Sequence, residues 1–415
     1  MEVVVLVDAY APTARLTRAF LDHGCAVVRV QSTAEVPPFY RGALRLDEFT
    51  DNIVHHGDLG ETAAAVGKHE PVAVLAAGEL GVELADQLSE TLGLPTNGTG
   101  QSLARRDKYV QIETVKAAGL RGAHQLLVTD AGALADWHRA LGGRVVVKPL
   151  RSAGNDGVSN CDTPAESVAA YEAVLGRTTI FAERNEAVVA QEYLTGGEYV
   201  VNTVSRDGHH RATDLWKYSK MSIACGTRDR ITGAHLVGAG SPLRPVLVSY
   251  AFDVLDALGI RHGPAHLEIM LTPDGPCLVE VGARICGANK AYYAELAAGE
   301  SQLSWTVDAY LNPARFLASH ERPYEVRNHV AISWPTSPVA GTLRSYPLLD
   351  EVRALESFNN LEIYVSPGGQ VPETVDDSTK ALAVGLAHPV EEIVTRDFHT
   401  IGYLDGPGFY ELEES

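Results

Sequence analysis

The chain has 415 residues, of which 45% are hydrophobic and 21% are charged, and its formal net charge at pH 7 is −19. This composition is typical of a soluble globular enzyme with two or three lobes and excludes a disordered chain. So acidic a chain also disfavours binding to nucleic-acid phosphates or anionic membranes, because both depend on clustered lysine and arginine.

The cysteines and the first residues indicate the compartment. The five cysteines are scattered and form no Cys-x-x-Cys pair, which disfavours both a disulfide framework and a zinc site. The N-terminal apolar run has the length of a strand and lacks the basic start of a signal peptide. No apolar run is long enough to cross a bilayer. We therefore expect a cytoplasmic protein.

Residues 1–95 predict a doubly wound parallel sheet of the α/β class. Apolar runs at 3–7, 26–30 and 72–76 have the length of short buried strands. Helical patterns at 13–23 and 82–92 follow the first and the third run, and each ends at a glycine. Such alternation of strand and helix is typical of parallel sheets covered on both faces.

Beyond residue 95 the alternation becomes irregular, which favours lobes that mix helices with antiparallel strands. The last hundred residues are rich in proline and glycine and predict a small mixed α/β lobe. Helical patterns cover 102–118, 164–175 and 242–258, strand patterns cover 144–148, 188–193 and 198–205, and a turn at 273–275 joins strands 266–271 and 277–281 as a hairpin.

Several common catalytic motifs are missing from the sequence. There is no G-x-x-x-x-G-K-[ST] loop, and the first strand is not followed by G-x-G-x-x-G. The H-E-x-x-H and G-x-S-x-G patterns are missing as well. The N-terminal sheet is therefore expected to lack a dinucleotide fingerprint, and zinc or serine hydrolysis has no support.

A lysine and a glycine-rich loop follow the apolar strand at 144–148. Lys148 ends this strand, so its ammonium would point at whatever lies above the strand end. The loop at 152–158 contains Gly154 and Gly157, and glycines let backbone N–H groups turn inward around phosphate oxygens. A solvent-facing lysine beside a mobile loop is the alternative, and for the lysine alone it is favoured.

Two carboxylates flank a Gly-Gly turn. Glu192 ends the strand at 188–193, and Glu198 begins the next strand. A carboxylate beside exposed strand backbone can pair with the amino edge of adenine and with ribose hydroxyls. An edge strand with acidic side chains that prevent aggregation is the alternative, and it is favoured when this segment is taken in isolation.

The predicted hairpin carries the most specific pair of acids. Glu268 and Glu280 lie one on each strand, and both can face the same, largely buried side. Buried paired acids repel each other unless a cation lies between them, and oxygen ligands suit Mg²⁺. Arg284 can grip a carboxylate or phosphate with two hydrogen bonds. A cross-strand network of salt bridges with Arg284 is the alternative.

The order of these parts is more specific than any one of them. The chain begins this order with a lysine near the start of the helical segment and the lysine at the strand end. The glycine-rich loop, the two acids around Gly-Gly and the set Glu…Glu-x-x-x-Arg follow in turn. In this order, residues 96–310 resemble the ATP-grasp superfamily, and residues 280–287 are similar to the L-amino-acid (dipeptide) ligases. The resemblance implies a Rossmann-like domain before the grasp (1–95), a linker helix and first grasp lobe (96–190), a second lobe with the metal site (191–315) and a C-terminal subdomain (316–415).

The resemblance also implies roles for the matching residues. Lys108 and Lys148 would contact the ATP phosphates, and Arg284 would hold the substrate carboxylate and its acyl-phosphate, so that Arg284 and Lys148 are the expected catalytic residues. Glu268 and Glu280 would hold one or two Mg²⁺, with Mn²⁺ as an alternative metal. ATP binding would further involve Ser152, Gly154, Gly157, Val158, Glu192, Tyr193, Leu194 and Glu198, and substrate binding would involve Gly287, Glu79 and His235.

One residue departs from the family pattern. Many ATP-grasp enzymes carry an asparagine two residues after the second metal-binding glutamate, whereas this chain has Gly282 at that position. Glycine has no side chain with which to ligate a metal. The second Mg²⁺ would therefore depend on a bridging Glu280, on phosphate oxygens and on water.

The expected reaction is ATP-dependent formation of an amide bond between an amino-acid carboxylate and the amine of a second substrate, with release of ADP and phosphate. Phosphorylation supplies the leaving group that a carboxylate lacks, and the protein contributes alignment and neutralisation of charge. The partners would be two amino acids, or an amino acid and an amine, with no nucleic acid or membrane, and a homodimer is left open. A phosphotransferase, a biotin-carboxylase-like enzyme and a non-catalytic nucleotide-binding protein are the alternatives.

Overall fold

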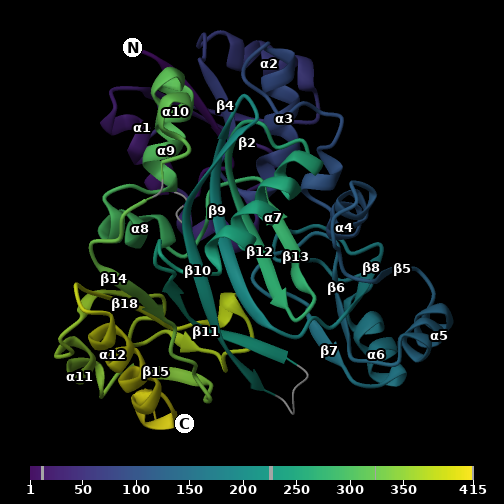
Figure 1. Cartoon of the computed structure of the whole chain (residues 1–415), viewed down its shortest axis with the longest axis vertical. Coiled ribbons are helices and arrows are strands. Elements are labelled where there is room, and N and C mark those ends of the chain that lie inside the picture. Colours follow the sequence, from purple (N-terminus) through teal and green to yellow (C-terminus); the bar gives the residue numbers. More distant parts are fainter. Residues whose placement is uncertain (11–13, 224–227, 323, 414–415) are drawn as a thin grey trace.

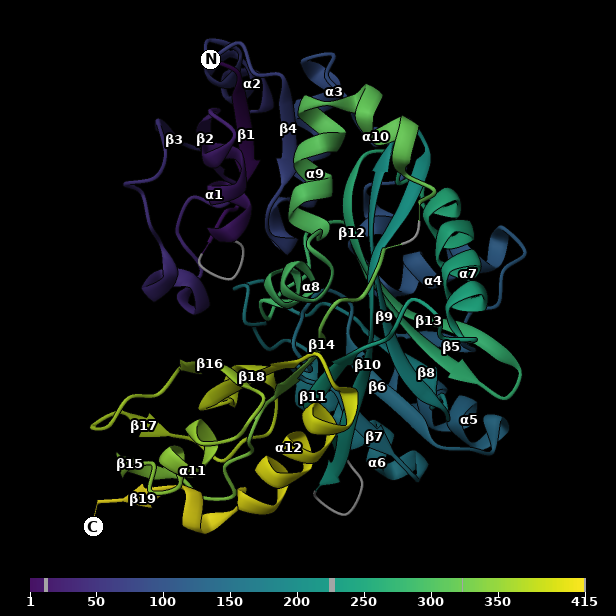
Figure 2. The same cartoon turned by 60° about the vertical axis from the view of Figure 1, so that its left-hand side comes forward.

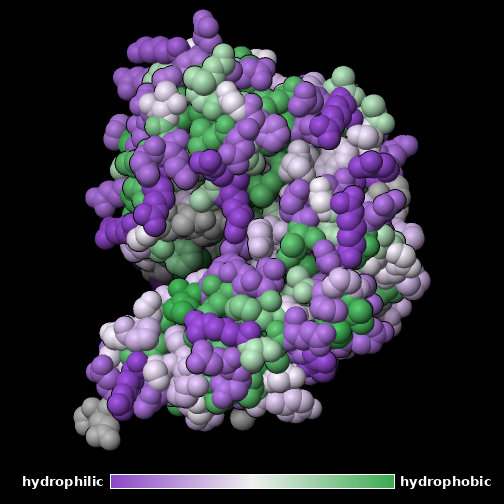
Figure 3. Space-filling view, turned by 90° about the vertical axis from the view of Figure 1, so that its left-hand side faces the viewer, coloured by the Kyte–Doolittle hydropathy of each residue, from purple (hydrophilic) through white to green (hydrophobic). Residues whose placement is uncertain are grey.

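The computed structural model describes residues 1–10, 14–223, 228–322 and 324–413. The N-terminal domain lies at the top of the molecule in Figure 1, long antiparallel strands cross its centre, and the C-terminal strands and helices lie at the bottom. In the described part of the chain, no helix has the length and apolar character needed to span a membrane. The side of the molecule drawn in Figure 3 is mostly hydrophilic, with smaller hydrophobic groups between the polar side chains.

The N-terminal sheet is fully parallel with strand order β3-β2-β1-β4, as its residue pattern predicts. The strand and helix at β3 and α2 escaped the sequence analysis, because the strand is short and half-exposed and carries Asp51 and Asn52. The strand expected third is therefore the fourth. The elements are β1 (Val3–Val7), α1 (Ala14–Asp22), β2 (Ala26–Gln31), β3 (Asp51–Val54), α2 (Leu59–Gly67), β4 (Ala73–Ala76) and α3 (Val82–Thr91), with short 3-10 turns η2 (Pro38–Ala43) and η3 (Glu79–Gly81).

The next lobe is a four-stranded antiparallel sheet, β5-β8-β6-β7, with α5 and α6 packed on it. The helix expected over 102–118 is interrupted, because Asp107 leaves the helical conformation and caps α4 by accepting from the amides of Tyr109 and Val110. Lys108 is thereby the first residue of α4. The elements are η4 (Leu103–Arg105), α4 (Lys108–Ala117), β5 (Gln125–Val128), α5 (Ala131–Leu141), β6 (Val145–Pro149), β7 (Ser159–Cys161), α6 (Pro164–Val174) and β8 (Val188–Glu192).

An eight-stranded sheet with order β13-β12-β9-β10-β11-β14-β18-β16 forms the centre of the molecule. The long strands β10 and β11 were not predicted, because polar and apolar residues alternate irregularly there and a bulge between Ser219 and Lys220 shifts the register. The elements are β9 (Gly197–Arg206), β10 (His209–Ile223), β11 (Arg228–Leu236), α7 (Arg244–Ala257), β12 (Gly263–Thr272), β13 (Gly275–Gly282), α8 (Lys290–Ala298), α9 (Gln302–Leu311) and α10 (Pro313–Ser319).

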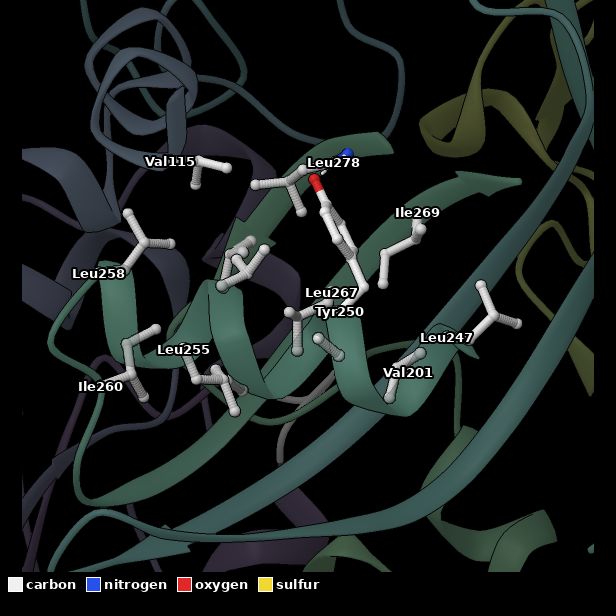
Figure 4. Packing of buried hydrophobic residues seen from close by; sticks show 14 of the residues in the cluster. Val115, Val201, Leu247, Tyr250, Leu255, Leu258, Ile260, Leu267, Ile269 and Leu278 are labelled. Atoms are coloured by element: carbon white, nitrogen blue, oxygen red, sulfur yellow. Dashed lines mark hydrogen bonds between the residues drawn. The ribbon is translucent and has the colours of Figure 1, made fainter. Parts of the chain in front are cut away.

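The largest hydrophobic cluster fills the space between this sheet and α7. Leu247, Tyr250 and Leu255 of α7 lie over Val201 of β9 and Leu267 of β12, as Figure 4 shows. On the N-terminal side, α9 lies beside α1 and β4, so that it joins the N-terminal domain to the central strands (Figure 2). Helix α9 therefore contributes side chains both to the cluster of the N-terminal domain, through Val307, and to a small cluster with Val204 of β9, through Trp305 and Ala309.

The C-terminal strands extend the central sheet. β11 pairs with β14, β14 with β18 and β18 with β16, all antiparallel, and α12 covers them. The sheet thus crosses the boundary expected at residue 316, and the domain limits stay predictions. The elements are β14 (His329–Ser333), β15 (Gly341–Ser345), α11 (Leu349–Arg353), β16 (Phe358–Ile363), β17 (Gln370–Val371), η6 (Asp377–Thr379), β18 (Leu382–His388), α12 (Glu391–Leu404), η7 (Pro407–Phe409) and β19 (Glu411–Leu412), and β17, β15 and β19 form a small separate sheet.

A buried arginine ties three of these parts together. Arg105 is fully buried and donates two hydrogen bonds to Asp86 of α3, at 3.1 and 2.9 Å, and one to the Leu258 carbonyl beyond α7, at 2.9 Å. It also donates to the carbonyl of Gly98. The guanidinium therefore satisfies acceptors from the N-terminal domain, the connecting segment and the central lobe at once.

Replacing this arginine should destabilise the whole chain. Arg105→Ala leaves Asp86 buried without its cation, and we expect a loss of about 3–5 kcal/mol in the free energy of unfolding, measured by urea denaturation. Arg18→Ala removes an exposed pair with Asp22 on α1 and should cost less than about 1 kcal/mol. Similar losses in the two variants would contradict the role given to Arg105.

Candidate active site

A cavity of about 570 Å³ lies between the β5-β8-β6-β7 lobe and the central sheet. Its volume is within the range of small-molecule and cofactor pockets. Strands from both lobes and the glycine-rich loop contribute to its walls. Most residues predicted to bind nucleotide or metal line it, namely Lys108, Lys148, Ser152, Gly154, Val158, Glu192, Tyr193, Leu194, Glu198, Glu268 and Glu280.

The two acids of the hairpin lie directly opposite one another. Glu268 of β12 pairs with Glu280 of β13, and a β-bulge follows at once, since Ile269 pairs with Leu278 and Val279 is left over. Val279 and Glu280 consequently both face the cavity, although they are consecutive. Without the bulge, the alternation of a strand would send one of them to the hydrophobic core.

The bulged strand is held from its outer edge by side chains. The Gln111 amide of α4 accepts from the Val281 N–H at 2.7 Å and donates to the Val281 carbonyl at 2.9 Å. The Leu278 N–H donates to the Tyr250 hydroxyl at 2.9 Å. Because Lys108 begins the same helix as Gln111, this pairing also fixes the lysine beside Glu280, where their charged groups are 2.9 Å apart.

Lys148 occupies the end of β6, as its sequence position predicts. Only 6% of this residue is exposed, and burial lowers the pKa of its ammonium to about 8 although the neighbouring Glu280 opposes this shift. Lys108 adds to the lowering. The two lysines therefore line the same cavity, with Glu280 beside both of them.

The glycine-rich loop is folded over this end of the cavity. Gly154 and Gly157 have φ of 65° and 70°, values that favour glycine. The Ser152 carbonyl accepts from the Lys108 ammonium at 2.6 Å, and the Ser152 hydroxyl donates to Asp156 at 2.6 Å. Gly157 is turned away from the cavity and packs against Pro149.

A segment of the C-terminal lobe holds this loop. The Asp377 N–H, in the first residue of η6, donates to the Gly154 carbonyl at 3.0 Å, and the Asp377 carboxylate pairs with Lys380 at 2.6 Å. Asp377 also lines the cavity. We call residues 374–380 the clasp, because they fasten the loop to the far side of the cavity.

The other end of the cavity is formed around the Gly-Gly turn. Glu192 accepts from the His124 N–H at 2.9 Å, and Glu198 forms an ion pair with Lys220 of β10. Burial raises the pKa of Glu198, and Lys220 opposes this shift. Lys220 and Asp229 were missed by the sequence analysis, since they lie on the two strands that it did not predict.

Beyond the acids, Glu79 lies between two guanidinium groups. It accepts from Arg106 at 3.2 Å and from Arg284 at 3.0 Å. Burial acts to raise the pKa of Glu79, but Arg284 and Arg106 outweigh it and lower the pKa. A Cβ on Gly282 would lie 3.0 Å from the Glu79 carboxylate and 3.3 Å from the Arg284 guanidinium. The asparagine expected at this position would therefore disturb the Glu79–Arg284 pair, which gives a steric reason for the glycine.

The remaining two substrate-binding predictions concern Gly287 and His235, and neither residue lines the cavity. Gly287 lies three residues after Arg284, and open space surrounds the position of its missing Cβ. His235 is not among the residues that line the cavity. Its ring packs 4.2 Å from that of Phe398 of α12, and burial lowers its pKa to about 4. The structure thus does not bring His235 together with the other predicted site residues.

His266, which the sequence analysis did not select, positions Glu268. Asn202 donates its amide to Asp214 at 2.5 Å, so its oxygen faces Nδ1 of His266 at 2.9 Å, and Nε2 of His266 faces Glu268 at 3.3 Å. Both ring nitrogens meet acceptors, so the ring is held as an imidazolium. Burial acts to lower the pKa of His266, but Cys286 and Glu268 outweigh it and raise the pKa to about 9.

A proline in the clasp should release the glycine-rich loop. Asp377→Pro removes the N–H that holds Gly154, at a helix position where proline is well tolerated and after the extended residue Asp376. Asp377→Ala keeps the N–H and loses only the carboxylate. We expect amides of residues 152–158 to exchange about 5-fold faster in the proline variant than in the alanine variant, as loss of about 1 kcal/mol implies. Equal exchange rates would contradict the clasp.

The depressed pKa of Lys148 should appear in nucleotide binding. Phosphate groups favour the protonated lysine, so affinity for Mg·ATP should be constant below pH about 7 and should fall as the pH rises through about 8. The decline should be at most about tenfold per pH unit. Lys148→Arg keeps its charge and should flatten the profile measured by calorimetry. An equal decline in both proteins would assign the titration to another group.

Two of the comparisons with known proteins indicate the same family. No protein-family model matches the chain. The chain is 31% identical to dapdiamide A synthase of Enterobacter agglomerans, over 97% of this chain and 98% of that protein. Among solved structures, an L-amino acid ligase from Bacillus licheniformis matches with a TM-score of 0.79 and 17% identity, covering 100% of this chain and 99% of that one.

A third similar protein has been solved with a nucleotide. The biotin carboxylase domain of the 2-oxoglutarate carboxylase of Hydrogenobacter thermophilus, in complex with MgADP and bicarbonate, matches with a TM-score of 0.66 and 14% identity, over 99% of this chain and 90% of that one. The expected α/β fold, with a parallel N-terminal sheet followed by a grasp of two lobes, is thereby confirmed. The chain belongs to the ATP-grasp carboxylate–amine ligases, which use ATP to form an amide bond.

Proposed function

We propose that this ligase joins the carboxylate of one amino acid to the amine of a second amino acid, through an acyl-phosphate, with release of ADP and phosphate. The observation that carries the proposal is the opposed pair Glu268–Glu280, with Lys108 and Lys148 on one side and Arg284 beyond it. The names of an amino acid ligase and a dapdiamide synthase among similar proteins support amino-acid substrates.

The donor set fits a divalent cation. Two carboxylates face each other across paired strands at the end of a cavity large enough for a nucleotide, and paired acids favour a cation between them. Glu268 and Glu280 would hold Mg²⁺, which when bound would supply neutralisation of the phosphate charge. His266 and the Asn202–Asp214 pair keep the Glu268 carboxylate oriented for this task.

The protein's own groups would perform alignment and charge neutralisation. The transferred phosphoryl group would be held by Lys108, Lys148 and the amides of residues 152–158. The adenosine would be held by the segment Glu192–Glu198, around the Gly-Gly turn. Arg284, once it exchanges part of its pairing with Glu79 for substrate, would stabilise the negative charge on the activated carboxyl group. A neutral amine then attacks the carbonyl carbon, and phosphate leaves.

Water must be kept from the activated carboxyl group, because hydrolysis would waste ATP. The glycine-rich loop, fastened by the clasp, covers the phosphate end of the cavity. Closure of this kind excludes water and commits the substrate to reaction. The loop therefore supports a ligase, whose intermediate needs protection.

The alternatives have less support. A phosphotransferase, a biotin-carboxylase-like enzyme and a non-catalytic nucleotide-binding protein are not favoured by the relatives named above. Other features stay proposals, namely a cytoplasmic location, substitution of Mn²⁺ for Mg²⁺, a homodimer, and the lack of nucleic-acid or membrane partners. The free, buried state of the four described cysteines is compatible with a reducing compartment.

The role of Glu280 can be tested with product analysis. Wild-type protein should release ADP only when ATP, Mg²⁺ and a productive pair of amino acids are all present, and mass spectrometry should find the dipeptide mass. Glu280→Ala should lower this rate by at least about 100-fold, because the metal loses one of its two protein ligands. The exposed Asp136→Ala serves as the control and should leave the rate unchanged.

Two results would contradict the proposal. Near wild-type phosphate release by Glu280→Ala would show that the metal assignment is wrong. A stable phosphorylated product without any amide, in a screen over amino-acid pairs, would replace the ligase with a phosphotransferase.

A further inference from the structure

A further buried lysine near the site, Lys290, forms no ion pair with any described residue. Lys290 is the first residue of α8, and only 3% of it is exposed. Its ammonium lies 5.0 Å from the centre of the Tyr218 ring and 5.4 Å from that of the Trp334 ring. Within the described residues it has neither a hydrogen bond nor an ion pair, so its contacts there are with two aromatic faces.

A neighbouring lysine, Lys380, lies in a similar environment but has an ion-pair partner. Lys380 lies over the same Trp334 ring, at 4.2 Å, and pairs with the Asp377 carboxylate at 2.6 Å. A buried ammonium is costly unless it is paired and hydrogen-bonded. Cation–π contacts recover part of this cost but use none of the three N–H donors. Lys290 therefore keeps N–H donors that no described residue accepts, and Glu268 acts on its charge only from beyond ion-pair distance.

The position of Lys290 relates it to the reacting groups. Tyr218 lines the cavity, and its hydroxyl donates to Glu268 at 3.3 Å, so one aromatic ring separates Lys290 from a proposed metal ligand. Lys290 also lies six residues after Arg284, in the segment that leads from β13 into α8. Lys290 itself does not line the cavity and lies against the Tyr218 ring, which does.

The charges of the pocket favour an anion at this point. Lys220, His266 and Lys290 all surround Glu268, and a bound Mg²⁺ would add further positive charge there. ATP phosphates would neutralise the lysines on the nucleotide side. They would not reach behind Tyr218, so the excess of positive charge would remain at Lys290.

We propose that the Lys290 ammonium binds a substrate carboxylate other than the one that is activated. This inference rests on the proposed function. In an amino-acid ligase the acyl substrate gives up its carboxylate to phosphorylation, whereas the attacking amino acid keeps its α-carboxylate as an anion. A side-chain carboxylate on the acyl substrate has the same chemistry. Either would accept charge-assisted hydrogen bonds from the free ammonium.

The test compares substrates with and without this carboxylate. For an amino-acid pair that yields a product, each substrate is offered in turn with its unactivated carboxyl group free or as the primary amide. Wild-type protein should prefer one free acid over its amide by about 100-fold in kcat/KM, and Lys290→Met should reduce that preference to about 3-fold or less. Lys290→Arg should restore at least part of it.

The result also identifies the source of the carboxylate. Loss of preference for the free acid in the amine substrate assigns Lys290 to the attacking amino acid, and loss in the acyl substrate assigns it to that side chain. The KM for ATP should change less than about 3-fold in either case, because Lys290 does not line the nucleotide cavity. A larger change confined to ATP would overturn the proposal and assign the lysine to phosphate.

Two further outcomes distinguish failure of this proposal from misfolding of the variant and from failure of the proposed function. If Lys290→Met does not fold, the wild-type preference alone decides, since equal use of free acids and amides by the wild type would overturn the proposal. A retained preference in a folded Lys290→Met would overturn it too. Absence of any amide product with wild-type protein would instead contradict the proposed function.

Discussion

The geometry of the site depends on one β-bulge in the pairing of β12 with β13. The bulge at Val279 lets two consecutive residues of β13 face the cavity and brings Glu280 opposite Glu268. Because β13 is the edge of the central sheet, its outward amides would be unpaired without Gln111 and Tyr250. The same side chains that satisfy this edge therefore hold the bulge, and Gln111 also carries Lys108 into place. The edge strand β13, Glu280 and Lys108 are therefore held in place by the same contacts.

The cavity gathers several basic side chains although the chain as a whole is acidic. The chain as a whole carries −19, yet Lys108, Lys148 and Lys220 surround the cavity, with Arg106 and Arg284 beyond it. An acidic exterior disfavours nonspecific binding of polyanions, while basic groups in a low-dielectric pocket interact strongly with a small anion. Among the described residues, seven acids line the same cavity as four lysines, so the lysines alone do not neutralise a bound polyphosphate, and Mg²⁺ would carry much of the neutralisation in the bound state.

Much of the site could be predicted because its residues occupy sharp local patterns. A lysine at the end of an apolar strand, glycines in a loop and acids on a hairpin are each visible in a few residues, and the structure gathers them around one cavity. Lys220 and Asp229 could not be found in this way, since they lie on β10 and β11, whose irregular polarity and bulge hide the period of a strand. Tertiary contacts determine the rest. Asp377 reaches Gly154, and Glu79 reaches Arg284, across more than 200 residues of chain, and His235 faces α12 because strand register directs it there.

The continuity of the central sheet into the C-terminal strands limits how this enzyme can be divided. β14 covers the edge of β11, and the clasp between β17 and β18 fastens the glycine-rich loop at the cavity. A chain cut after α10 would leave β11 as an open edge, with its N–H and C=O groups free to pair with other molecules. The last hundred residues are therefore part of the catalytic unit and not a module that evolution or engineering could exchange freely. A change of specificity is therefore to be expected from substitutions within the cavity and not from exchange of this lobe.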